Sequence, residues 1–310
     1  EILFIKAGTG TGKSHLVAHW MNEYYSERGC IFLGYRNGLL YQQCDKVKNL
    51  EHLRAADADG FLRLLDPYYR VAFCDASLHT MKEKGGTASE KILVIDEVTS
   101  VLQSLYLGKT CSSKRRTRVE VFEKMLLDAV MVICLDAHLA QWCVDLLTKL
   151  SNKVARKMQN EWEGEPRKVK MLLGTETNPN DKKAIRREII EAAKDNRAIA
   201  VFSDSKLELE TLHKLMVKEN VEERTILRID SSTSGFPWCQ ECLRNIDKYL
   251  EEHPEIKILL VSPSGDSGLD ISRKYFEKVF LILFGTLTID SALQMYGRVR
   301  DNSIPRTIFC

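Results

Sequence analysis

Short apolar runs separated by amphipathic stretches organise the chain. In the first half, the runs occupy residues 2–5, 31–35, 71–74, 92–96 and 130–136. In the second half, they occupy residues 169–173, 198–203, 225–230, 258–262, 279–284 and 307–310. The runs are continuous rather than alternating, which is typical of strands buried on both faces in a parallel sheet covered by helices.

The stretches between the runs predict helices. Two of them, 182–195 and 205–218, are long enough for the right-handed crossovers that connect parallel strands. A polar segment, 151–168, separates the two series of runs, and its string KVARKM is one further candidate strand. The pattern therefore predicts an α/β protein with two tandem domains, 1–160 and 161–310, each a mostly parallel sheet covered by helices.

Composition narrows the class of protein. The 310 residues are 44% hydrophobic and 28% charged, which is typical of a soluble globular protein. No apolar run approaches the roughly 20 residues that span a bilayer, so no membrane partner is expected. A net charge of +2 argues neither for nor against nucleic acid, because a binding groove can be local. Both ends fall inside apolar runs and the first residue is Glu1, so we expect a piece truncated at both ends from a longer protein.

The cysteines indicate the compartment. There are nine, an odd number, and several, such as Cys74 and Cys134, fall inside apolar runs. Scattered, buried thiols suit a reducing, cytoplasmic location. The pair Cys239-x-x-Cys242 could form half of a zinc site, but no second pair stands at ligand spacing, so zinc is the less favoured alternative.

A phosphate-binding motif follows the first apolar run. The string AGTGTGKSH fits the P-loop pattern, in which Ala or Gly is followed by four residues and then by Gly-Lys-Ser/Thr, between a predicted strand and a predicted helix. Glycines let backbone N–H groups surround phosphate oxygens, and the helix N-terminus adds partial positive charge. Lys13 is predicted to meet the β- and γ-phosphates and Ser14 to ligate Mg²⁺; the alternative is a glycine-rich turn. The predicted nucleotide site comprises Ala7, Gly8, Thr9, Gly10, Thr11, Gly12, Lys13 and Ser14.

An acidic pair ends the fourth apolar run. In VIDEVTS, Asp96 and Glu97 stand at the C-terminal end of a predicted parallel strand, where ligands bind in open α/β sheets. Asp96 is predicted to hold Mg²⁺, directly or through water, and Glu97 to orient and activate the attacking water. The alternative is an acidic pair that only initiates a helix. With the P-loop, the pair predicts hydrolysis, with ATP and Mg²⁺ as cofactors, rather than phosphoryl transfer to a hydroxyl.

The motifs, taken in order, resemble those of the superfamily 2 helicases over nearly the whole chain. DEVT stands in the place of the DEAD/DExH box. The further matches are CLDAHL (134–139) for the third motif, VFSDSK (201–206) for motif IV, SPSGDSGLDI (262–271) for motif V and QMYGRVR (294–300) for motif VI. The resemblance implies two RecA-like domains that hydrolyse ATP at their interface.

The second domain would contribute to the same nucleotide site by this resemblance. Gly268, Asp270 and Gln294 are expected to contact the nucleotide. Arg298 and Arg300, on what reads as a helix, are expected to reach the γ-phosphate as catalytic arginines. The alternative for both arginines is a solvated basic face.

Two departures from the family pattern affect these expectations. Asp136-Ala137-His138 replaces the usual Ser-Ala-Thr of the third motif. Asp301 stands where the second arginine of motif VI commonly falls, so Arg300 is the candidate arginine finger in its place.

Contacts to the backbone of a nucleic-acid strand are implied by the same resemblance. The alternative for each residue is a loop cap or a helix N-cap. A basic cluster, KRRTR (114–118), either adds phosphate contacts or is a solvated loop. The predicted strand contacts are Arg36, Asn37, Ser77 and Ser203.

A narrower resemblance links the chain to origin-binding proteins and the cyanobacterial plasmid replication family. The strings that carry it are GYRNGLLYQQC, VAFCDASLHTM, DEVTSVLQSLYLGKTC and GRVRD. It implies an ATP-dependent DNA helicase or translocase in replication, acting on single-stranded or forked DNA and fused to a primase-like or origin-binding domain. The alternatives are an RNA helicase of the same superfamily and an ATP-switched origin-binding module that does not unwind.

Overall fold

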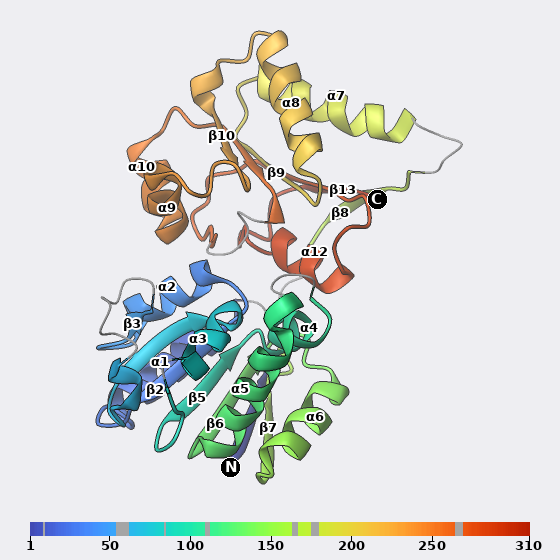
Figure 1. Ribbon diagram of the computed structural model, residues 1–310. Helices are drawn as coiled ribbons and strands as arrows, with labels where there is room; N and C mark the ends of the chain where they lie inside the picture. Colours follow the sequence, from blue (N-terminus) through green and yellow to red (C-terminus); the bar gives the residue numbers. More distant parts are fainter. Residues whose placement is uncertain are drawn as a thin grey trace. The chain divides into compact units, whose positions relative to one another are not determined.

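The computed structural model describes residues 1–8, 10–53, 62–83, 85–108, 112–162, 167–174, 180–263 and 269–310. The chain divides into two compact units, Glu1–Glu163 and Gly164–Cys310. Figure 1 shows the first in blue to green and the second in yellow-green to red. Every strand pairing among the described residues is parallel. The predicted α/β architecture with two parallel sheets is confirmed.

The first unit is built on one sheet with the strand order β3-β4-β2-β5-β6-β1-β7. Its strands are β1 (Ile2–Lys6), β2 (Cys30–Gly34), β3 (Glu51–His52), β4 (Arg70–Cys74), β5 (Ile92–Asp96), β6 (Met131–Asp136) and β7 (Ala155–Gln159). Its α-helices are α1 (Lys13–Glu23), α2 (Asn37–Lys46), α3 (Leu78–Glu83), α4 (Val98–Tyr106), α5 (Arg115–Asp128) and α6 (Gln141–Ser151). Short 3₁₀ helices lie at η1 (Leu62–Leu65), η2 (Asp75–Ser77) and η3 (Ser112–Lys114).

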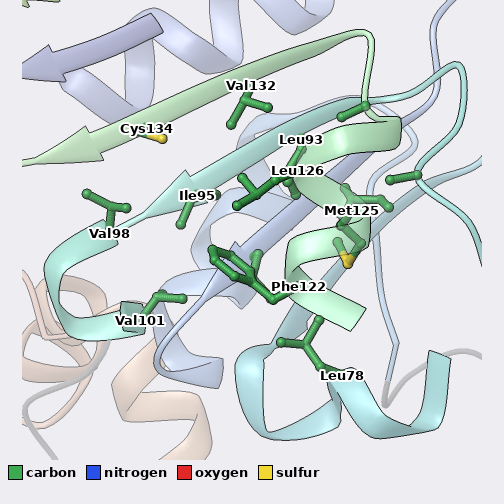
Figure 2. Packing of buried hydrophobic residues seen from close by; sticks show 14 of the residues in the cluster. Leu78, Leu93, Ile95, Val98, Val101, Phe122, Met125, Leu126, Val132 and Cys134 are labelled. Atoms are coloured by element: carbon green, nitrogen blue, oxygen red, sulfur yellow. The ribbon is translucent and has the colours of Figure 1, made fainter. Parts of the chain in front are cut away.

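Successive residues of the central strands pack on opposite faces of this sheet, because side chains alternate along a strand. Leu93 and Ile95 of β5 pack in the core formed with α3, α4, α5 and α6. Ile92 and Val94 of the same strand pack in the core formed with α1 and α2. Figure 2 shows the first of these cores, in which Phe122 of α5 is fully buried. Continuous apolar strands are therefore required, since both faces are covered.

The second unit repeats this arrangement with the strand order β10-β11-β9-β12-β13-β8. Its strands are β8 (Val169–Leu172), β9 (Ile199–Ser203), β10 (Ile226–Ile229), β11 (Ile258–Val261), β12 (Lys278–Ile282) and β13 (Arg306–Phe309). Helices α7 (Asn180–Lys194) and α8 (Lys206–Lys218) cover one face. The other face is covered by α9 (Pro237–Arg244), α10 (Ile246–Glu252) and α12 (Ile289–Tyr296), and η4 (Glu223–Thr225) precedes β10.

The predicted strands recur at closely similar residues, with differences at the sheet edges. The candidate strand KVARKM forms β7, which pairs with β1 and is exposed along its length. The run at 169–173 forms β8, which pairs with β13 and is largely exposed rather than buried. The short strand β3 was not predicted. In the described ranges, no helix combines the length and apolar character needed to cross a bilayer.

We expect Phe122→Ala to lower the free energy of unfolding of the first unit by about 3–5 kcal/mol, because it leaves a cavity in a close-packed core. Leu127→Ala is the control on the same helix, since Leu127 is 54% exposed and its truncation is expected to cost less than about 0.5 kcal/mol. Urea unfolding followed by circular dichroism measures both. Equal effects of the two substitutions would contradict the packing described.

Candidate nucleotide and nucleic-acid site

Three loops with candidate chemistry leave the same edge of the first sheet. The P-loop follows β1, the acidic pair follows β5 and the third motif follows β6, and β5, β6 and β1 are neighbours in the sheet. Lys6 of β1 is in register with Asp136 of β6, and Asp96 of β5 with Leu135. Because the strands are parallel, their carboxyl ends meet at one edge, where ligands bind in open α/β sheets.

The P-loop is held in a turn that requires glycine. Gly10 and Gly12 have φ angles of 80° and 86°, in the left-handed region that glycine adopts without steric cost. An added Cβ at Gly12 would meet no described atom within 4 Å, so conformation rather than space calls for glycine there. The hydroxyl of Thr11 donates to the carbonyl of Gly8 (2.7 Å). Gly12 is the N-cap of α1, so the turn delivers the chain to a helix N-terminus. Thr9 lies outside the described residues.

The Lys13 side chain binds back to the start of the P-loop. Its Nζ donates to the carbonyl oxygens of Ala7 (2.5 Å) and Gly8 (2.9 Å). Its positive charge also acts on Asp96, where it opposes the rise of the carboxyl pKa that burial causes. The ammonium group therefore lies between the phosphate loop and the acidic strand end, and Ser14 follows it in the first turn of α1.

Asp96 is the buried member of the acidic pair, with 8% of its surface exposed. Its Oδ2 accepts from Gln43 Nε2 (3.1 Å), and its Oδ1 accepts from the backbone N–H of Glu97 (3.0 Å). Burial raises the pKa of Asp96 above its ordinary value, against the opposing charge of Lys13 and these hydrogen bonds. The carboxylate of Asp96 and the hydroxyl of Ser14 are oxygen donors of the kind Mg²⁺ prefers, so the residues fit this ion.

Glu97 has an unusual backbone conformation for a residue with a side chain. Its φ and ψ are 52° and 54°, in the left-handed region, where it is the N-cap of α4. Such a conformation costs on the order of 1–3 kcal/mol and is typical of functional sites. The turn bends the chain from β5 into α4 at the edge of the sheet, and Glu97 is half-buried there.

Asp136 joins all three loops. Its carbonyl accepts from the N–H of Ala7 (3.2 Å) in the P-loop. Its Oδ2 accepts from the N–H of Thr99 (2.8 Å) in the first turn of α4, and its Oδ1 from that of His138 (2.8 Å). The side chain is almost fully buried. The residue that departs from the Ser-Ala-Thr pattern thus binds the backbone of the P-loop, of the first turn of α4 and of its own loop.

The motif VI arginines lie beyond a helix, not on it. Helix α12 ends at Tyr296 with Gly297 as its C-cap, and Val299 forms a parallel bridge with Ile271. The prediction that the arginines lie on a helix is therefore wrong, because the chain leaves the helix and pairs at Val299 with Ile271, the last residue of motif V. Gln294 is half-buried in the last turn of α12.

The structure brings Asp270 and Arg300 together. Arg300 Nε donates to Asp270 Oδ1 (2.6 Å), and the side chains are 23% and 45% exposed. The backbone of Ile271 donates to the carbonyl of Arg298 (2.8 Å) and accepts from the N–H of Arg300 (2.9 Å). Arg298 itself is 6% exposed. Gly268, predicted on the same loop, lies outside the described residues.

Arg306 holds the segment that carries both arginines. From the first position of β13, its guanidinium donates to the carbonyls of Tyr296 (2.9 Å), Val299 (2.7 Å) and Asp301 (2.8 Å). Burial lowers the pKa of Arg306 to about 10, so it stays charged at neutral pH. No local signal in the sequence points to Arg306, because it lies after the end of the motif.

The residues of the first unit that are predicted to contact a nucleic-acid strand lie at one edge of its sheet. Arg36 is the N-cap of α2 after β2, with its guanidinium 5.4 Å from the ring centre of Tyr35, and Asn37 begins the helix. Ser77 ends η2 after β4 and is half-buried. Strands β2 and β4 are neighbours in the sheet, so these residues follow adjacent strand ends. Those ends lie at the same edge of the sheet as the P-loop.

Ser203 requires a correction. Its side chain has no exposed surface, and its hydroxyl accepts from the backbone N–H of Ser205 (3.1 Å). A fully buried hydroxyl cannot contact a nucleic-acid strand. The Ser203 side chain instead shapes the loop after β9. Neighbouring Asp204 accepts from the N–H groups of Phe284 and Thr286 and fixes that loop.

The basic cluster at 114–118 is not a solvated loop throughout. Helix α5 begins within it, and Arg118 is almost fully buried in an ion pair with Asp75. Arg116 pairs with Glu120 of the same helix at 3.0 Å. The cluster therefore serves packing at Arg118 and presents charge only at its exposed members.

The cysteine pair of α9 is buried in an apolar core. Cys239 and Cys242 are free thiols with no exposed surface. Burial raises the pKa of Cys239 to about 11. No group of three or more His, Cys, Asp or Glu side chains in the described part of the chain is arranged to hold a metal ion.

The chain is similar to known proteins in its fold and not in its sequence. The sequence matches no protein-family model and no curated protein. Among solved structures, the chain is similar to the DUF1998 helicase MrfA bound to DNA, with 15% identity and a TM-score of 0.62 over 100% of this chain and 44% of that one. It is also similar to Saccharomyces cerevisiae Dbp5 bound to RNA and ADP BeF3, with 18% identity and a TM-score of 0.66 over 99% of this chain and 78% of that one.

Mycobacterium smegmatis Lhr, a helicase bound to ssDNA and AMP-PNP, is a third neighbour, with 12% identity and a TM-score of 0.64 over 99% of this chain and 43% of that one. The likeness shows the fold, which is two RecA-like α/β domains as in these helicase structures. It spans less than half the length of the MrfA and Lhr chains. The narrower resemblance to origin-binding and plasmid replication proteins stays a prediction.

We expect Arg306→Met to destabilise the second unit by on the order of 1–3 kcal/mol, because carbonyls that Arg306 bonds in the motif VI segment lose a buried donor. Arg197→Met is the control, since Arg197 forms an exposed pair with Asp195 whose loss should cost less than about 1 kcal/mol. Hydrogen exchange of the amides near residues 296–301 measures the local effect. Unchanged protection there in Arg306→Met would contradict the anchoring role.

Proposed function

We propose that this chain is the ATP-hydrolysing motor core of a nucleic-acid helicase or translocase. The observation that carries the proposal is the junction at Asp136, which binds the P-loop, the turn after Asp96 and Glu97 and the third motif at one sheet edge. A glycine-rich phosphate-binding loop beside a pair of carboxylates is the arrangement that nucleotide hydrolysis requires.

Each residue of the first unit has a role in this proposal. Backbone N–H groups of the P-loop and Lys13 bind the β- and γ-phosphates. Ser14 and Asp96 hold Mg²⁺, which when bound neutralises charge on the phosphates. Glu97 orients the attacking water and accepts its proton.

The second unit supplies Arg298 and Arg300 to the γ-phosphate in the proposed cycle, and Asp270 and Gln294 contact the nucleotide. Arg300 is paired with Asp270 in a partly exposed ion pair, and such pairs are worth about 0–1 kcal/mol. A guanidinium can exchange this partner for a phosphate at little cost. The pair therefore supports a role for Arg300 as a mobile arginine finger.

A single strand is the proposed partner, contacted through its backbone by Arg36, Asn37 and Ser77. We propose DNA, in replication of a plasmid or phage origin, on the resemblance of the strings in the first half. RNA is the second candidate, because Dbp5, a similar structure, is bound to RNA. A nucleotide-switched module that grips an origin without unwinding it is the third.

We expect ATP hydrolysis that single-stranded nucleic acid stimulates. Glu97→Gln should slow turnover by about 10²–10⁴-fold while ATP still binds, because it removes the proton acceptor but not the phosphate cradle. Lys13→Ala should lose both binding and turnover. Phosphate release and binding of a fluorescent ATP analogue measure the two effects.

The matched controls are Glu161→Gln and Lys157→Ala, two exposed positions of the first unit that should behave as the wild type. Turnover that is indifferent to nucleic acid, or a Glu97→Gln variant with full turnover, would contradict the proposed motor.

Strand preference and unwinding separate the candidate functions. With matched oligonucleotides, the proposed DNA enzyme should show higher ATPase stimulation by DNA than by RNA and should separate a tailed DNA duplex. Substrates with 3′ and 5′ tails, compared under ATP and under AMP-PNP, give the polarity. Stronger stimulation by RNA would favour the second candidate, and ATP-tightened binding without strand separation would favour the third.

A further inference from the structure

Gln43 is a buried polar residue that reaches the candidate metal ligand from another helix. It lies on α2 with 3% of its surface exposed, and its Nε2 donates to Asp96 Oδ2. Because an ionised carboxylate only accepts hydrogen bonds, this contact orients the amide with its nitrogen toward Asp96. Gln43 therefore holds one oxygen of Asp96, while the backbone of Glu97 holds the other.

The second polar atom of Gln43 has no bond. Among the described residues, Oε1 is buried and lacks a hydrogen-bond partner. Leaving a buried acceptor without a partner costs about 1–3 kcal/mol. An acceptor maintained at this cost beside Asp96 points to a ligand that donates to it.

Packing alone does not account for a glutamine at this position. Leu40, three residues before Gln43, lies on the same side of α2 and is buried in the apolar core, as is Val47, which follows the end of the helix. A methionine or leucine at residue 43 would continue that apolar stripe and remove the unsatisfied Oε1, although Asp96 Oδ2 would lose the donor Nε2. The amide must therefore be explained by the edge of the sheet that it faces.

A water on a bound Mg²⁺ would be the donor that Oε1 lacks. Mg²⁺ keeps several waters when it binds to one or two protein oxygens and phosphates, and those waters donate hydrogen bonds. Residues that bond both a metal ligand and a metal-bound water orient the site, and their loss typically weakens metal binding. Gln43 has one atom for each of these tasks.

We propose that Gln43 is a positioning residue of the Mg²⁺ site, which orients Asp96 through Nε2 and accepts from a metal-bound water through Oε1. The proposal rests on the proposed nucleotide function of the same edge. It also connects the site to α2, the helix that begins at the predicted strand contacts Arg36 and Asn37.

The test compares metal binding with nucleotide binding in Gln43→Met, a substitution of similar shape that cannot hydrogen-bond. Mn²⁺ binding in the presence of saturating AMP-PNP is measured from the electron paramagnetic resonance of free Mn²⁺, and AMP-PNP binding without metal by calorimetry in EDTA. Gln43→Met should raise the apparent Kd for Mn²⁺ by about 10-fold or more and change metal-free AMP-PNP binding by less than about 2-fold.

Gln42→Met is the matched control, because Gln42 is the same residue type on the next position of α2 and is only half-buried. Gln43→Asn, which keeps the amide but shortens its reach, should weaken Mn²⁺ binding in the same direction and serves if Gln43→Met does not fold. The thermal midpoint should change little in Gln43→Met, because the substitution removes the unsatisfied Oε1 together with the donor to Asp96 Oδ2.

Each outcome decides the proposal. Unchanged Mn²⁺ affinity in a folded Gln43→Met overturns it. Equal loss of Mn²⁺ affinity in Gln42→Met, or loss of metal-free AMP-PNP binding together with a lower thermal midpoint in Gln43→Met, assigns Gln43 a structural role and also overturns it. Wild-type protein that binds neither AMP-PNP nor Mn²⁺ with AMP-PNP refutes the proposed function itself.

Discussion

The parallel register of β5, β6 and β1 is the constraint on which the candidate site depends. It places Lys6 level with Asp136, and Asp96 level with Leu135, so that three loops leave the sheet at one edge. A shift of one residue in either pairing would turn alternate side chains to the opposite face and separate the loops. The apolar side chains on both faces of these strands oppose such a shift, because each face is buried against its own helices.

Buried charged side chains that bind backbone atoms fix the loops at these edges in both units. Asp136 accepts N–H groups from α4 and the third motif, Asp204 accepts them from the loop after β12, and Arg306 donates to carbonyls around motif VI. Loops cannot satisfy their own backbone groups as helices and sheets do, so a buried loop needs such partners. Buried charged side chains thus fix the loops of the candidate nucleotide site in the first unit and the segment that carries the motif VI arginines in the second.

The acidic pair shows how position divides labour between similar residues. Asp96 is buried, and burial raises its pKa, so its charged form depends on Lys13, on hydrogen bonds and, in the proposed function, on a metal ion. Glu97, one residue later, stands in a left-handed turn at the edge of the sheet. A buried ligand and a partly exposed neighbour are suited to different tasks, the first to holding a cation and the second to meeting water.

The sequence by itself determined the class of the fold and the local motifs, because continuous apolar runs and the string AGTGTGKSH are local patterns with local causes. The tertiary structure decided which residues are buried, where elements end and which residues come into contact. It buried Arg118, which no local signal distinguished from exposed residues, and ended α12 before Arg298. It also brought Gln43 to Asp96, which lies 53 residues further along the chain, and turned Arg306 of β13 back onto the motif VI carbonyls. Such contacts depend on strand order and register, which arise only when the whole sheet forms.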